Sequence, residues 1–278
     1  MRYDLWRSIK DPETELRNAL EKLADIFKKI CNSVGDNREE YVRRMNNFQN
    51  SYAYEKFVMS SVKRMVTPIA NQNAATWRKA ARKATKSRQI YLLLMRDINQ
   101  GLKQDIKDQI IENAALIRTL PNDVAQKVVN DITKEALEGK RATTIAQDIR
   151  DKTDQHARAS ARLIARTEVS KTTTALCKAR AENLGLNWYI WRTALDGDRV
   201  RKSHQIMEGV LVNWKNPPSP EELAGEPSVG NYHAGCIWNC RCYPEPVIDL
   251  DDAEWPAKVY HDGQIERMSR AKFETMGG

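Results

Sequence analysis

The sequence predicts a mainly α-helical protein, in which an elongated helical N-terminal region precedes a small α+β module with few strands. Two changes along the chain predict this fold class. Before Leu186 only three prolines occur, and apolar residues recur every three or four positions over long stretches. After it come seven prolines and five of the seven tryptophans. Residues 188–193 alternate with the period of a strand, and residues 209–214 are a second candidate strand.

Six helical segments are expected in the first part of the chain, and helix-capping and helix-breaking residues set their limits. Asp11 and Pro12 begin the first, because aspartate caps free backbone amides and proline fits the first helical position. Pro68 and Pro121 are expected to end helices, since proline lacks an amide hydrogen and clashes with the preceding turn. The expected helices cover residues 12–34, 41–67, 87–118, 122–138, 144–151 and 154–184.

This pattern divides the chain into three parts. Residues 1–118 form a helical region, a bundle or a set of hairpins, and residues 249–278 form a C-terminal tail. Between them, residues 119–248 combine helices over 122–184 with an α+β part over 186–248. That α+β part has trouble building a core by itself, so tryptophans, a bound metal or packing on the helices must stabilise it.

The charge of the chain is uneven. The net charge is +8, but residues 1–190 hold 35 basic and 23 acidic side chains, whereas residues 191–278 hold 10 basic and 14 acidic ones. Basic residues also repeat at helical spacing in two stripes, which predicts contact with DNA phosphates. The alternative is an ordinary solvated helix face. The stripes consist of Arg78, Lys79, Arg82, Lys83 and Lys86, and of Arg158, Arg162 and Arg166.

Composition and motifs argue against several classes of protein. No apolar run is long enough to span a membrane, and the charged start has no signal core. Five cysteines, an odd number, favour a reducing compartment over a disulfide framework. The sequence has no phosphate-binding loop, nucleophile elbow or zinc-protease helix, so we do not expect an enzyme.

The stretch HAGCIWNCRC, residues 233–242, is the strongest candidate for a site, because thiolate and imidazole are the ligands that tetrahedral zinc prefers. Cys240 and Cys242 can both reach one ion if Arg241 lies at a tight bend. The alternative is that the cysteines are small buried apolar residues in a metal-free turn. A catalytic cysteine is less favoured, because no spacing requires a base partner for it. The proposed structural zinc ligands are His204, Cys236, Cys240 and Cys242, with His233 as the substitute.

Two aspartates lie shortly before His204. Asp196 and Asp198 could bind a hard metal ion or act in acid–base chemistry, which would make the protein a metal-dependent nuclease or another DNA-processing enzyme. The alternative, which we prefer, is that these aspartates and the glycine between them form a turn after a strand.

A series of short motifs, specific only in combination, spans about residues 120–248. They are Ala165-Arg166-Thr167-Glu168, Trp191-Arg192-Thr193, Asp196 with Asp198-Arg199-Val200-Arg201, Ser203-His204, Gly209 and Asn239-Cys240-Arg241-Cys242. In this order the motifs closely resemble the phage Mu F-like minor head protein family, also called phage head morphogenesis or minor capsid proteins. A histidine or cysteine often precedes the last motif in this family, and here both His233 and Cys236 do.

The resemblance implies a virion component present in few copies inside the head and associated with the portal, assembled in the host cytoplasm. It implies a structural protein rather than an enzyme, with a role in head assembly and in DNA packaging or delivery. The partners it implies are the portal protein and the major capsid or scaffolding protein. Viral double-stranded DNA would be bound through the basic N-terminal half, and no membrane contact is expected.

Overall fold

The structure is a computed structural model that describes residues 5–8, 10–35, 37–83, 91–96, 102–137, 145–195 and 200–276. The chain forms two compact units, each built from segments that are distant in sequence. We call Lys10–Val66 with Asp108–Arg166 the helical unit, and Met1–Ile9, Thr67–Lys107 and Thr167–Gly278 the sheet unit.

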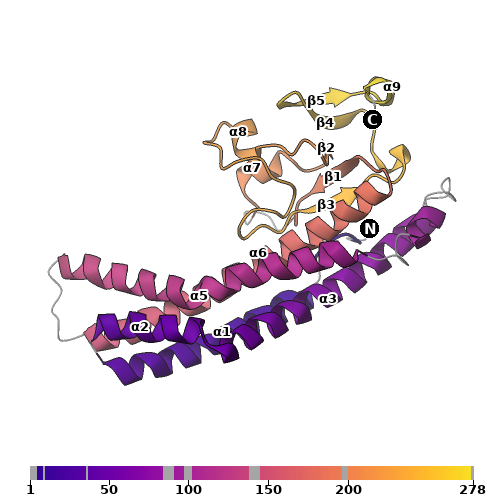
Figure 1. Cartoon of the computed structure of the whole chain (residues 1–278). Coiled ribbons are helices and arrows are strands. Elements are labelled where there is room, and N and C mark those ends of the chain that lie inside the picture. The colour runs from indigo at the N-terminus through magenta and orange to yellow at the C-terminus, as the bar shows by residue number, and fades with distance from the viewer. Residues whose placement is uncertain are drawn as a thin grey trace. The chain divides into compact units, whose positions relative to one another are not determined.

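The described residues form long helices followed by a small sheet with short helices around it (Figure 1), which confirms the predicted fold class. None of these helices combines the length and apolar composition that crossing a membrane requires. The helices are α1 (Lys10–Val34), α2 (Arg38–Gln49), α3 (Tyr52–Lys83), α5 (Lys103–Leu137), α6 (Ile145–Asn183), α7 (Lys202–Gln205), α8 (Pro220–Leu223), η3 (Leu250–Asp252) and α9 (Arg270–Thr275). The strands are β1 (Trp188–Arg192), β2 (Val210–Asn213), β3 (Tyr243–Pro246), β4 (Ala257–His261) and β5 (Gln264–Met268).

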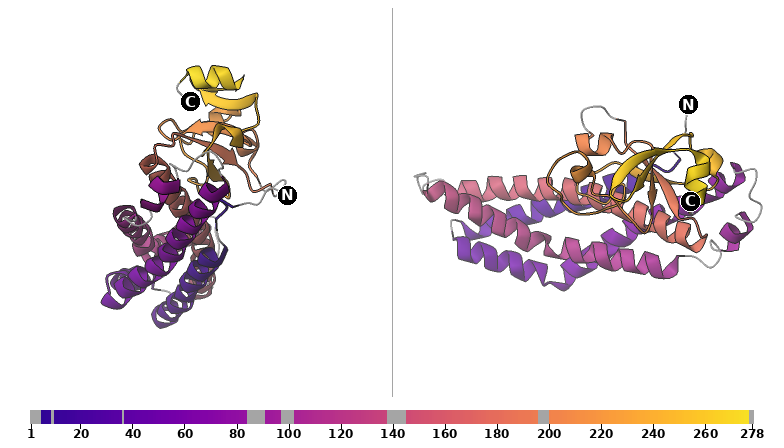
Figure 2. Two further views of the ribbon diagram at one scale, coloured as in Figure 1. Left: turned by 90° about the vertical axis from the view of Figure 1, so that its right-hand side faces the viewer. Right: turned by 90° about the horizontal axis from the view of Figure 1, so that it is seen from above.

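The helical unit is a bundle whose helices run side by side (Figures 1 and 2). The apolar face predicted for the first helix is its buried face, since Leu16, Leu20, Leu23 and Phe27 are at most 2% exposed. Hydrogen bonds from polar side chains also connect the helices of the bundle. For example, the hydroxyl of Tyr54 on α3 donates a hydrogen bond to a backbone carbonyl of α5. The unit therefore has an apolar core of its own.

Prolines do not end the helices as predicted. Pro68 lies inside α3 and Pro121 inside α5, although each removes a backbone hydrogen bond. Buried apolar residues continue on both sides of each proline, for example Val66 and Ile69 around Pro68. Packing of these faces outweighs the local cost of about 3 kcal/mol that proline carries in a helix interior.

Three further helix limits differ from the prediction. The segment expected as one helix over 41–67 is divided between α2 and α3, which meet at a turn. The helices expected over 144–151 and 154–184 are the single helix α6, apart from residue 144, which lies outside the described residues. The helix expected over 87–118 is helical at 91–96 and again from the start of α5, and its remaining residues before 102 lie outside the described part.

The sheet contains more of the chain than the sequence predicted. Its strand order is β3-β1-β2-β4-β5, with β2 and β4 parallel and the other neighbours antiparallel. The two expected strands are β1 and β2. The strands β4 and β5 lie in residues 249–278, so the prediction that this segment is a C-terminal tail is wrong for those strands. The turn between them, Asp262-Gly263, has positive φ at both positions and is the two-residue signal typical of hairpins.

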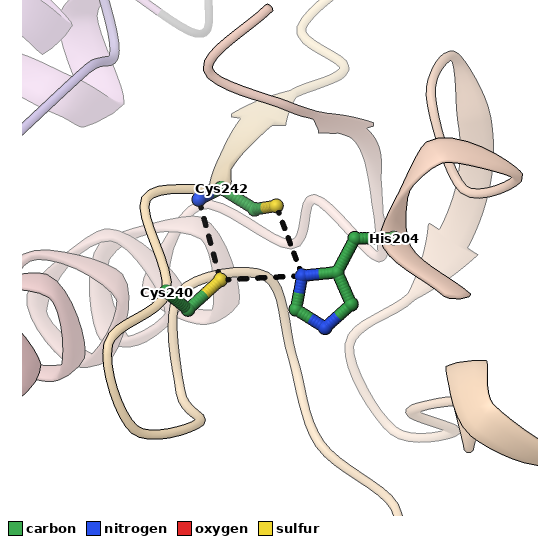
Figure 3. A group of neighbouring side chains, drawn as sticks. All are labelled: His204, Cys240 and Cys242. Carbon is green, nitrogen blue, oxygen red and sulfur yellow. Dashed lines mark hydrogen bonds between the residues drawn. The ribbon is translucent and has the colours of Figure 1, made fainter. Parts of the chain in front are cut away.

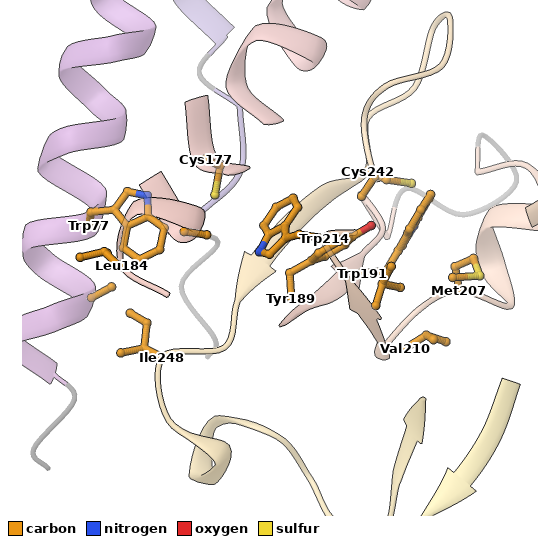
Figure 4. Close-up of a cluster of buried hydrophobic side chains, with 14 of the residues drawn as sticks. Trp77, Cys177, Leu184, Tyr189, Trp191, Met207, Val210, Trp214, Cys242 and Ile248 are labelled. Atoms are coloured by element: carbon orange, nitrogen blue, oxygen red, sulfur yellow. The ribbon is translucent and has the colours of Figure 1, made fainter. Parts of the chain in front are cut away.

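Alternate side chains of the sheet enter two separate cores, as the period of a strand requires. On one face, Tyr189, Trp191 and Val212 pack with apolar residues of α3 and α6 (Figure 4). On the other face, Ile190 and Leu211 pack with Phe273 of α9. The sheet gains its core by packing on helices, as its small size led us to expect.

Candidate metal centre

Three side chains from two separate parts of the sequence meet in the sheet unit (Figure 3). His204 lies on α7, and Cys240 and Cys242 lie on the loop that leads into β3. The Nδ1 atom of His204 is 3.5 Å from Sγ of Cys240 and 3.4 Å from Sγ of Cys242. The three residues are 2%, 5% and 3% exposed.

These distances fit a tetrahedral metal ion. Zinc lies about 2.3 Å from sulfur and about 2.0 Å from nitrogen, which places the two ligand atoms about 3.5 Å apart at tetrahedral angles. The separations from Nδ1 to the two sulfurs match this value within 0.1 Å. The imidazole of His204 and the thiolates of Cys240 and Cys242 are therefore suited to hold a metal ion, and its identity as zinc stays a prediction.

The imidazole of His204 is oriented by a chain of hydrogen bonds on its other side. Its Nε2 lies 2.9 Å from the hydroxyl of Tyr232, which donates to both carboxylate oxygens of Glu221 at 2.7 and 2.8 Å. Because the Tyr232 proton is directed to Glu221, the hydroxyl oxygen accepts from Nε2–H of His204. This tautomer leaves a lone pair on Nδ1, directed at the two sulfurs, which is the outer-shell arrangement common to metal-binding histidines.

The thiols of Cys240 and Cys242 affect the pKa of each other. A hydrogen bond from the Cys242 thiol lowers the pKa of Cys240 against the opposing effect of burial. The same hydrogen bond, together with burial, raises the pKa of Cys242. The Cys242 backbone amide also donates to the Cys240 sulfur at 3.3 Å. Cys240 is therefore already stabilised in the thiolate form that binds metals.

Hydroxyl groups of α6 hold the loop that carries the cysteines. Thr174 donates to the carbonyl of Ala234 at 2.7 Å, and Thr167 accepts from the backbone amide of Asn239 at 3.0 Å. Between these contacts, Gly235 has φ +85° and lies directly against α6. The backbone of the loop therefore lies too close to the helix for a side chain at this position.

We expect Gly235→Ala to lower the free energy of unfolding by about 2–3 kcal/mol, from overpacking and a disfavoured φ. A Cβ atom there would lie 2.7 Å from Oγ of Ser170 and 2.8 Å from the carbonyl oxygen of Cys242. The matched control is Gly263→Ala, which has a similar φ of +78° but nothing within 4 Å of its Cβ. Chemical denaturation of both variants measures the difference, and equal losses would contradict the close approach.

Cys236 and His233 lie outside this group of three. Burial raises the pKa of Cys236 to about 12, as expected for an inert thiol. The ring of His233 contacts the hydroxyl of Tyr189 at 3.2 Å and Nζ of Lys178 at 3.4 Å, so it faces other partners. The structure does not bring either residue to the metal centre, and their assignment as ligands stays a prediction.

The second basic stripe is part of an ion-pair ladder between α6 and α1. Arg158, Arg162 and Arg166 lie 3.5, 3.3 and 3.3 Å from carboxylate oxygens of Asp25, Glu21 and Glu13. Much of the positive charge of this stripe is thus balanced within the helical unit.

In the first stripe, Arg78 is half-buried and Lys79 and Arg82 are exposed, whereas the side chain of Lys83 and the whole of Lys86 lie outside the described part. DNA binding by either stripe stays a prediction. Among the motif residues, Glu168 is buried and 3.4 Å from Lys171, and Arg201 donates to the carbonyl of Trp238. Asp196, Asp198 and Arg199 also lie outside the described residues.

Two residues of the centre, Tyr232 and Glu221, were not predicted. They lie in and after the proline-rich segment, where no periodicity or metal-ligand spacing marks them. Thr167 and Trp191 were singled out only as parts of motifs, and their roles as a loop contact and a core residue required the structure.

Comparisons with known proteins agree with the sequence motifs. Residues 126–244 match the family of phage Mu protein F like proteins, which is a phage head family with structural or morphogenetic rather than enzymatic roles. An uncharacterised protein of Haemophilus influenzae (strain Rd) is 32% identical over 142 residues, which is 50% of this chain and 29% of that relative. No solved structure is significantly similar. The segment from residue 126 to residue 244 is therefore similar to the phage Mu protein F like family, in agreement with the resemblance of its motifs.

Proposed function

We propose that the protein is a structural component of the phage head in which a bound zinc ion fixes the loop of residues 233–242 to the sheet unit. The observation that carries this proposal is the group formed by His204, Cys240 and Cys242, which lies inside the family segment. Each of the three side chains is at most 5% exposed, so a metal held by them is suited to stabilise the fold.

The resemblance of the motifs further supports a minor capsid protein. In this role, a few copies lie inside the head near the portal and act in head assembly and in DNA packaging or delivery. Its partners are the portal protein and the major capsid or scaffolding protein. Arg78 and Arg82 are the best candidates for contact with viral DNA, because neither has an acidic partner among the described residues.

An enzyme is the second candidate, because three protein ligands with an open fourth position are also typical of catalytic zinc sites. The burial of the three ligands argues against it, since a substrate must reach the metal. Incubation of the protein with double-stranded DNA and Mg²⁺ or Mn²⁺ tests the nuclease form of this idea. We expect no cleavage; cleavage that is lost in Asp198→Ala would establish the enzyme instead.

The structural role is tested by phage production without the protein. We expect heads made without this protein to be defective in assembly or infection, and the protein to co-purify with portal protein from assembled heads. Supplying Cys240→Ser in place of the wild-type chain should fail to restore infectivity, whereas Lys215→Gln, an exposed change away from the metal centre, should restore it. Normal assembly and infection without the protein would refute the proposal.

A further inference from the structure

A groove of about 560 Å³ lies between α1 and α3 of the helical unit, which run side by side (Figure 1). Its walls consist of residues about one turn apart, at positions 15, 19 and 22 of α1 and at 57, 61 and 65 of α3. Each helix thus turns one continuous face toward the groove. This is the form of surface that accepts a further helix lying along the first two.

The floor of the groove is largely apolar and leaves one polar group unsatisfied. Leu16 and Met65 are buried there, and Ala19 supplies a small side chain. Ser61 also lines the groove and is 3% exposed, and its hydroxyl oxygen has no hydrogen-bond partner in the described part of the chain. Because an unpaired buried hydroxyl costs free energy, a polar side chain brought to the groove gains a stabilising partner.

The charged residues of the groove are Glu15 and Lys22 on α1 and Arg64 on α3, and all three are exposed. None of them forms an ion pair with the residues that the structure describes. Glu15 and Lys22 lie about 10 Å apart along the helix axis, with Asn18 and Ala19 midway between them. This face of α1 therefore carries opposite charges at equal distances from a centre that includes a small side chain.

We propose that the groove binds the same groove of a second copy of the chain, with the two α1 helices antiparallel about a two-fold axis near Ala19. In a two-fold contact, residue i of one copy meets residue j of the other, and j meets i. Glu15 of each copy then meets Lys22 of the other, which gives two identical ion pairs. The small side chain of Ala19 lets the helices approach closely at the axis. Asn18 brings an amide group to the groove as a partner for the Ser61 hydroxyl.

The positions of the charges favour a second copy over other partners. Arg64 leaves each groove with one excess positive charge, so net charge alone does not draw two copies together. A uniformly acidic or uniformly basic partner would meet a like charge at Glu15 or at Lys22. A helix with the opposite order of charges satisfies both ends, and α1 itself has this order when it runs antiparallel. The contact uses the helical unit alone, so it does not depend on the metal centre or on the role in the phage head.

The test is sedimentation velocity of the full chain over a range of concentrations, with charge-reversal variants. We expect the wild type to dimerise reversibly. Glu15→Lys and Lys22→Glu should each weaken the dimer about tenfold, because each variant places two pairs of like charges where the wild type has two ion pairs. An equimolar mixture of the two variants should recover the dimer, because every such pair between the two chains then joins opposite charges.

Lys28→Glu is the matched control, because Lys28 is an exposed lysine of α1 that does not line the groove. This variant should dimerise as tightly as the wild type. Thermal unfolding should show an intact fold in every variant, since only exposed side chains are changed. The proposal is overturned if the wild type is monomeric at every concentration, if neither reversal weakens the dimer, or if the mixture associates no more tightly than the single variants.

Discussion

Replacing Cys240 with serine is expected to release the metal and to lower the free energy of unfolding by about 4 kcal/mol, since metal-binding energy in such sites is folding energy. The remaining His204 and Cys242 cannot hold zinc tightly, and the loop then loses its connection to α7. For a protein of this size, the loss corresponds to a decrease of about 10 °C in Tm. Calorimetry of the wild type and the variant, each with and without a chelator, measures it.

Cys177→Ser is the control for this experiment. Cys177 is also a buried free cysteine of the sheet unit, but it belongs to the apolar cluster and not to the metal group. We expect it to keep its metal and to remain sensitive to the chelator, whereas Cys240→Ser should be insensitive. A wild-type protein whose Tm the chelator does not change would favour the alternative of buried thiols in a metal-free turn.

The second large effect is expected on acidification, at His233. Burial, with a contribution from the neighbouring Lys178, lowers the pKa of His233 to about 4, whereas the ordinary value is 6.5. The unfolded chain therefore takes up a proton between these values and the folded protein does not, so stability is complete above pH 6.5 and decreases as the pH falls toward 4. The full difference is about 3 kcal/mol.

Denaturation curves between pH 7 and pH 4 measure this decrease. In His233→Phe, which has no imidazole to titrate, the free energy of unfolding should decrease by about 3 kcal/mol less. Acid also releases a bound metal from both proteins, so the difference between them isolates the contribution of His233. In Lys178→Met the decrease should be reduced, because removing the cation raises the pKa of His233. If the free energy of unfolding depended on pH in the same way in the wild type and in His233→Phe, the buried imidazole would not contribute to the loss of stability in acid.

Much of the fold followed from local patterns. The spacing of apolar residues at three and four positions correctly predicted the buried face of α1, and the alternation of residues 188–193 correctly predicted β1. Both patterns are visible in the sequence because burial of one face of a helix or strand imposes its period on the apolar residues. The prediction that Pro68 and Pro121 end helices was wrong. The sequence shows the local cost of proline in a helix, but it does not show the tertiary packing that outweighs this cost. The strands β4 and β5 were missed because β5, QIERM, has little apolar content and depends on its neighbour for pairing.

The metal centre was predictable in part. Ligand chemistry pointed to His204, Cys240 and Cys242, because few other residue types bind zinc, and the structure brings these three together. The contacts around them were not predictable. Tyr232 and Glu221 reach His204 only through the path of the proline-rich segment, which no short-range pattern encodes. The arginines of α6 look like a DNA-binding stripe in sequence, but their acidic partners lie on α1.

The central claim, that His204, Cys240 and Cys242 hold a structural zinc ion, is tested most directly by measuring the metal in purified full-length protein. Elemental analysis combined with X-ray absorption should find about one zinc ion per chain, with two sulfur neighbours at about 2.3 Å and a nitrogen neighbour at about 2.0 Å. The zinc should be absent from Cys240→Ser. A fully folded and stable wild-type protein without bound metal, or zinc retained in Cys240→Ser, would contradict the claim.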